Sequence, residues 1–159
     1  MENRICIRPG TAADVPAVHA LIVELAVYER EPDAVINTPE EMVRDGYGER
    51  PLFETIVAEV EGRVVGFALF YTAYSTWKGP VLYLEDFLVT ESWRRKGVGE
   101  LLFTAVKAEA SKRGVRRMDW QVLDWNEPAI NFYKKAGAML DPEWINARFA
   151  EEDLKADNS

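Results

Sequence analysis

The sequence has a single cysteine, Cys6, so the chain cannot form an intramolecular disulfide. It also has few basic residues: 19 Lys and Arg against 27 Asp and Glu give a net charge of −8 at pH 7. One cysteine favours a reducing compartment, and we expect a cytoplasmic location. The acidic balance argues against a nucleic-acid partner, which needs basic surface against phosphates. An acidic cleft instead concentrates cationic small molecules.

The chain also lacks a long hydrophobic run, since no apolar stretch approaches the roughly 18–20 residues of a membrane helix. We therefore expect no membrane association. The first residues lead into a short strand-like run and not into the apolar core of a signal peptide. A length of 159 residues predicts a single domain over 1–159. The end of that domain, 150–159, is polar and is expected to fray.

Hydrophobic periodicity and breaker residues divide the chain into alternating elements. Thr11 and Asp14 resemble a capping box before a helix that runs to about Tyr28. Strands are expected near 5–8, 53–60, 64–74, 81–89, 115–123 and 144–149, and further helices over 38–46, 97–113 and 127–137. This order predicts an α/β fold with a mixed central sheet and helices on its faces. Cys6 is expected to be a small core residue.

The strongest local motif is the turn Arg94-Arg95-Lys96-Gly97-Val98-Gly99, which follows a strand and opens a long helix. Such a turn exposes backbone N–H groups at the positive end of a helix dipole, which favours a bound phosphate. It is neither a P-loop nor the three-glycine dinucleotide fingerprint. Taken alone, the motif is equally compatible with an ordinary turn that carries solvated basic residues.

A second motif follows the next strand, and it contains Asn126, Ala129, Phe132, Tyr133 and Gly137. The turn Arg-x-x-Gly-x-Gly followed by Asn-x-x-Ala-x-x-Phe-Tyr-x-x-x-Gly resembles the GNAT superfamily of acetyl-CoA-dependent N-acetyltransferases. The runs Tyr83-Leu84-Glu85-Asp86-Phe87 and Trp125-Asn126-Glu127-Pro128 resemble the diamine (spermidine/spermine) branch of that superfamily. The resemblance covers the chain from Ile7 to about Gly137. It implies the GNAT fold, with a central sheet splayed at the acetyl-CoA cleft, and a homodimer.

The resemblance also implies which residues hold acetyl-CoA, the co-substrate, and it implies no metal. Main-chain groups of Phe87, Leu88 and Val89 would bind the pantetheine arm, as an added strand does. The pyrophosphate would lie in the turn. The complete cofactor set expected in this way is Phe87, Leu88, Val89, Arg94, Arg95, Lys96, Gly97, Val98, Gly99, Glu100, Asn126, Glu127, Pro128 and Ala129.

The same resemblance assigns the catalytic and acceptor residues. Tyr133 would be the general acid that protonates the leaving thiolate, and Glu85 would accept the proton of the attacking amine. A small cationic amine would be bound by Tyr28, Glu29, Glu85, Asp86 and Glu143. Because adjacent strand residues point to opposite faces, at most one of Glu85 and Asp86 is expected to face the site.

Each of these residues also has a purely structural interpretation. Tyr133 could be a packing residue on a short helix, and Glu29 could belong to a solvated acidic loop. The acceptor could be thialysine, another amino-acid-like amine, or a protein lysine or N-terminus instead of a polyamine. A non-catalytic acyl-CoA-binding regulatory module on the same fold is the alternative from another class. The presence of both Tyr133 and Glu85 favours catalysis.

Overall fold

The computed structural model describes residues 4–156, which form a mixed α/β fold. The chain divides into two compact units, Met1–Gln121 and Val122–Ser159. The first unit contains one five-stranded sheet in the order β1-β2-β3-β4-β5. Neighbouring strands from β1 to β4 are antiparallel, and β5 runs parallel to β4. The prediction of a mixed sheet flanked by helices is therefore confirmed.

The elements follow the predicted order as far as α4. The strands are β1 (Ile5–Pro9), β2 (Glu54–Val60), β3 (Arg63–Ser75), β4 (Gly79–Val89) and β5 (Met118–Trp120). The first unit also has helices α1 (Val15–Tyr28), α2 (Pro39–Tyr47) and α3 (Val98–Lys112), and 3-10 turns η1 (Ala12–Asp14) and η2 (Glu91–Trp93). The second unit contains α4 (Glu127–Lys135) and α5 (Glu151–Ala156). Among residues 4–156, no helix is both long and apolar enough to cross a membrane.

The 3-10 turn η1, which leads directly into α1, carries the predicted capping box of Thr11 and Asp14. Arg8, at the end of β1, donates hydrogen bonds to both carboxylate oxygens of Asp14, at 2.7 and 2.9 Å. These bonds lower the pKa of Asp14 to about 2, so the carboxylate stays charged. The first turn of α1 is thereby tied to the edge strand of the sheet.

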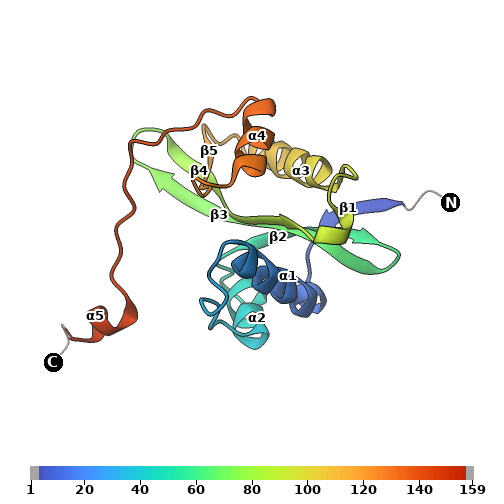
Figure 1. Cartoon of the computed structure of the whole chain (residues 1–159). Coiled ribbons are helices and arrows are strands. Elements are labelled where there is room, and N and C mark those ends of the chain that lie inside the picture. The colour runs from blue at the N-terminus through green and yellow to red at the C-terminus, as the bar shows by residue number, and fades with distance from the viewer. Residues whose placement is uncertain (1–3, 157–159) are drawn as a thin grey trace. The chain divides into compact units, whose positions relative to one another are not determined.

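The sheet is covered on both faces by helices of its own unit (Figure 1). Helices α1 and α2 lie on one face and α3 on the other. On the first face, Val18 and Leu21 of α1 pack in a cluster with Leu69 of β3. On the second face, Leu102 of α3 packs in a cluster with Val60 of β2. The first face is the one that carries the candidate acidic site.

Cys6 is not a core residue, contrary to expectation. It is exposed, although it lies in β1. Its neighbours Ile5 and Ile7 pack against the cluster beneath α3. Because side chains alternate along a strand, this arrangement turns Cys6 outward at the sheet edge.

The strand expected over 144–149 is wrong, because residues 138–150 contain no helix or strand. The side chains of Trp144 and Phe149 are 77% and 78% exposed. Strand preference of a segment depends on a neighbouring strand to pair with and a face to bury, and no ladder includes this segment in the part of the chain that is described. Where a frayed end was expected over 150–159, the structure has α5; residues 157–159 lie outside the described residues.

Candidate functional site

A β-bulge in β4 shapes the candidate site. In the ladder between β3 and β4, Phe70 pairs with Leu84 and Leu69 pairs with Asp86. Glu85 is therefore an extra residue with no cross-strand partner. A bulge of this kind interrupts the alternation of side chains, so residues on either side of it need not obey the usual period of two.

The bulge places Glu85 and Asp86 on the same face of the sheet. Leu69 faces α1, and Tyr71, two residues further along β3, shares that face. Their cross-strand partners are Asp86 and Tyr83, which must lie on this face as well. The carboxylate of Glu85 reaches the same face, because the Tyr71 hydroxyl donates a hydrogen bond of 3.1 Å to its Oε2. The expectation that only one of the two acids faces the site is wrong, and the bulge is the reason.

Asp86 is the acid whose chemistry is most altered. Its pKa is raised to about 6, first by burial and then by the negative charges of Glu85 and Glu29. Glu29 is the C-cap residue of α1, and burial raises its pKa too. Helix α1 ends there because the next residue, Arg30, adopts a left-handed conformation with φ 64°. The end of α1 thus brings a third carboxylate toward the two of the bulge.

Two tyrosines border these acids, and the sequence analysis missed both. Tyr71 and Tyr83 are direct cross-strand partners, with ring centroids 5.4 Å apart and planes inclined by 31°. Burial, followed by the charge of Glu85, raises the pKa of each hydroxyl, that of Tyr71 to about 12. The only sequence signal for them is their position on strands next to Tyr28-Glu29 and Glu85-Asp86. That signal cannot be used without the strand register.

The C-terminal part of β4 has a neighbouring strand on one side only. Strand β5 pairs with β4 only at Leu82, Tyr83 and Leu84. Beyond the bulge, Phe87 to Val89 pair with β3, while no described strand pairs with their other side. Pairing between β4 and β5 thus ends just before the bulge, as the predicted splay of the sheet requires.

The glycine turn lies between β4 and α3, as predicted. Arg95 and Gly97 both adopt left-handed conformations, with φ 61° and 83°. Gly97 is the N-cap of α3 and offers no capping side chain, so the first N–H groups of this 15-residue helix have no acceptor within the helix. Glu100 lies in the first turn and Val98 is buried. The ammonium of Lys96 lies over the Trp93 ring, 4.6 Å from its centroid.

Arg94 has a different environment from the rest of the turn. Its guanidinium donates to the main-chain oxygen of Val89 at 3.0 Å and forms an ion pair of 3.4 Å with Glu24 of α1. It also lies over the Tyr28 ring, 5.4 Å from the centroid. Glu24 accepts a further hydrogen bond of 2.7 Å from the hydroxyl of Thr90. These contacts make Arg94 the link between α1 and the start of the turn, and Glu24 is a residue that the sequence analysis missed.

The remaining candidates belong to the second unit. Asn126 is the N-cap of α4, and its side chain accepts a hydrogen bond of 3.3 Å from the Ala129 N–H. Tyr133 lies on α4, is 7% exposed, and its ring meets that of Phe132 edge to face at 5.6 Å. Glu127 and Pro128 form the exposed first turn of this helix. Glu143 is exposed in the irregular segment, and its N–H donates to Asp141 at 3.0 Å.

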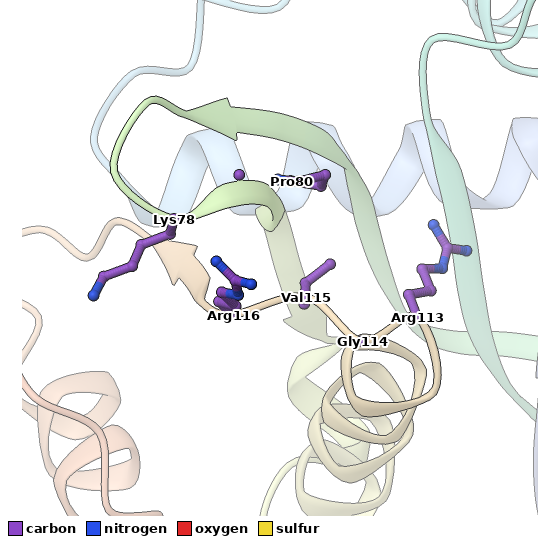
Figure 2. Close-up of a pocket in the computed structure, with 7 residues that line it drawn as sticks. Lys78, Pro80, Arg113, Gly114, Val115 and Arg116 are labelled. Carbon is purple, nitrogen blue, oxygen red and sulfur yellow. The ribbon is translucent and has the colours of Figure 1, made fainter.

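A separate pocket lies at the other end of β4, with a volume of about 260 Å³. Figure 2 shows the Lys78 and Arg113 side chains on opposite sides of it, with Arg116 between them. Arg113 is already paired with Glu54 and Glu109, at 2.7 and 2.9 Å. None of the site residues predicted from the sequence lines this pocket.

Within residues 4–156, no group of three or more His, Cys, Asp or Glu side chains is arranged to hold a metal ion.

Comparison with known proteins gives a consistent result. Residues 19–138 match the Acetyltransferase (GNAT) family. The chain is 38% identical over 158 residues to human spermidine/spermine N(1)-acetyltransferase-like protein 1, covering 93% of this chain and 23% of that protein. It is 37% identical over 162 residues to thialysine N-epsilon-acetyltransferase of Bos taurus, covering 95% of each. Among solved structures, aminoglycoside N-acetyltransferase AAC(6')-Iy in complex with CoA has a TM-score of 0.72 at 19% identity, over 94% of this chain and 97% of that one.

The chain thus spans less than a quarter of the first relative, which is the longer protein, and nearly all of the second. The structural match, at 19% identity, supports the fold.

The raised pKa of Asp86 predicts a pH-dependent cost in stability. With a folded-state pKa of about 6 against the ordinary value of 3.8, this carboxyl favours folding fully below pH 4, and that contribution is lost as the pH rises through 6. Asp86→Asn should therefore raise the free energy of unfolding at pH 7.5 by on the order of 2 kcal/mol and leave it nearly unchanged at pH 4. Urea unfolding at the two pH values measures this difference.

The matched control is Asp45→Asn. Asp45 is paired with Arg44, which lowers the pKa of Asp45, so its loss should bring no gain at pH 7.5. An Asp86→Asn protein that gained equally at both pH values would contradict the account.

Proposed function

Because the chain belongs to the acetyltransferase (GNAT) family and is an acetyl-CoA-dependent N-acetyltransferase, we propose that its acceptor is a primary amine of a small polycation, with spermidine as the first choice. The observation that carries this proposal is the convergence of three carboxylates, those of Glu29, Glu85 and Asp86, at one end of α1. Three acids in a protein of net charge −8 attract a substrate with several ammonium groups. The printed names of the two relatives, which refer to spermidine, spermine and thialysine, agree with a small amine acceptor.

The residues of the first unit fit acetyl-CoA. On the side of β4 that has no neighbouring strand, an extended ligand could bind main-chain groups of Phe87, Leu88 and Val89, in the manner of an added strand. The turn from Arg95 to Glu100 offers helix N–H groups to a pyrophosphate, and a Cβ at Gly97 would meet nothing within 4 Å, so the approach is open. When bound, acetyl-CoA supplies the thioester that carries the acetyl group.

The acids have two tasks in the proposed mechanism. An amine with a pKa near 10 is mostly protonated at pH 7, and only its neutral form attacks a thioester. Glu85 accepts the proton of the attacking amine, directly or through a water molecule. Asp86 and Glu29 bind the other ammonium groups of the acceptor. A main-chain N–H of β4 beyond the bulge stabilises the negative charge that develops on the acetyl oxygen.

Tyr133 is proposed as the general acid that protonates the leaving thiolate. The support for this role is the family motif, which runs from Asn126 to Gly137, and the helical position of Tyr133 within it. Asn126 stabilises the first turn of this helix through its bond to the Ala129 N–H, and both are proposed to flank the thioester.

Thialysine is the second candidate acceptor. The relative with that name matches 95% of its own length at 37% identity, so an amino-acid-like amine has specific support. It differs from spermidine in carrying a carboxylate, which three clustered acids would repel.

A panel of acceptors separates these candidates. We expect initial rates of acetyl-CoA consumption with spermidine to exceed those with thialysine, lysine and a short lysine peptide.

We also expect Glu29→Gln to raise KM for spermidine more than KM for a monoamine of similar length, because only the polycation has a second ammonium to place there. Equal effects on both KM values would remove Glu29 from the acceptor site, and no acetylation of any amine would refute the proposed function.

The test of Tyr133 removes only its hydroxyl. Tyr133→Phe should lower kcat by about 10²–10⁴-fold, the usual contribution of general acid catalysis, while acetyl-CoA affinity and the melting temperature change little. Single-turnover rates are the appropriate measurement, because slow product release can mask a loss in the chemical step. If the single-turnover rate of the Phe variant matched that of the parent from pH 7 to 9, Tyr133 would be a packing residue.

A further inference from the structure

We propose that Tyr71 is a positioning residue that holds the carboxylate of Glu85 in its working orientation. This inference rests on the proposed function, in which Glu85 accepts the proton of the amine. The observations behind it are the bulge, which leaves Glu85 without a cross-strand partner, and the hydrogen bond from the Tyr71 hydroxyl to its carboxylate.

Glu85 needs an external constraint because of its place in the strand. Residues opposite one another in a ladder restrict each other's side chains, and Glu85 has no such partner. Its side chain is exposed. An exposed glutamate has three rotatable bonds, and fixing them costs free energy that a contact must supply. The nearby charge of Asp86 repels its carboxylate and favours an orientation toward solvent.

Tyr71 is well placed to supply that constraint. It is half-buried in β3, and its ring packs against the ring of its cross-strand partner Tyr83. A tyrosine ring held in this way has little freedom, so its hydroxyl occupies a defined point. That hydroxyl lies 3.1 Å from Oε2 of Glu85. Through this hydrogen bond, the carboxylate of Glu85 is held at a fixed position relative to the sheet.

The hydroxyl of Tyr71 acts as a donor throughout the working pH range. Burial and the charge of Glu85 raise the pKa of Tyr71 to about 12. The hydroxyl therefore keeps its proton and donates to the carboxylate of Glu85. A donor of this kind is compatible with Glu85 as a proton acceptor, since it uses one carboxylate oxygen and leaves the other available.

The test is Tyr71→Phe, which keeps the ring and its packing on Tyr83. Loss of one hydrogen bond to a charged group should lower kcat/KM for spermidine by about tenfold, mainly through kcat. KM for acetyl-CoA and the melting temperature should stay unchanged. Tyr74→Phe is the matched control, because Tyr74 lies on the same strand and is 76% exposed; it should behave like the parent.

A double variant distinguishes positioning from a general structural effect. If Tyr71 acts through Glu85, Tyr71→Phe should have no further effect on kcat in the Glu85→Gln background. An equal tenfold loss in both backgrounds, or a lowered melting temperature with unchanged kcat, would overturn the inference. If Tyr71→Phe had the same kcat and KM as the parent, the inference would be overturned. If Glu85→Gln still lowered kcat strongly in that case, the proposed function would stand without the inference. If Glu85→Gln had no effect on acetylation, the proposed role of Glu85 itself would be wrong.

Discussion

The bulge at Glu85 is the local constraint on which the proposed amine site depends. A regular β4 would alternate Glu85 and Asp86 between the two faces of the sheet. The extra residue places both acids on the face of α1, where Glu29 ends the helix. Burial, and after it the charges of Glu85 and Glu29, raise the pKa of Asp86, so holding all three carboxylates charged costs free energy. A bound polycation would offset the part of that cost that comes from the like charges.

The bulge also separates the part of β4 that pairs with two strands from the part that pairs with one. Before the bulge, β4 is paired on both sides, with β3 and β5; after it, pairing continues only with β3. After Val89 the chain continues into the turn at the start of α3, where Gly97 has no side chain to cap the first N–H groups of the helix. Arg94 and Glu24 join the beginning of that turn to α1. One strand thus connects the surface proposed for acetyl-CoA with the acids proposed for the amine, and α1 is tied to both.

Much of the fold could be predicted from local sequence signals. The capping box of Thr11 and Asp14, Gly97 and the apolar periodicity of α1 and α3 act within a few residues, so they need no knowledge of the tertiary structure. The face of Asp86, the role of Arg94 and the contact of Tyr71 depend instead on register and on contacts such as Arg94–Glu24, 70 residues apart. The segment 144–149 has strand-like composition, yet composition alone supplies no partner strand. The family resemblance indicated Glu85 and Asp86 as candidates, but only the bulge explains how two adjacent acids share a face.

The most direct test of the central claim is proton release when spermidine binds. Near pH 6 about half of Asp86 is protonated, and a polycation bound among three carboxylates favours its charged form. Calorimetric titrations with spermidine at pH 6, in buffers of different ionisation enthalpy, should therefore show release of about half a proton per site, and none at pH 8. At pH 6 every amine of spermidine is already protonated, so the protons released at that pH come from the protein. Binding with the same heat in every buffer at pH 6 would contradict the account.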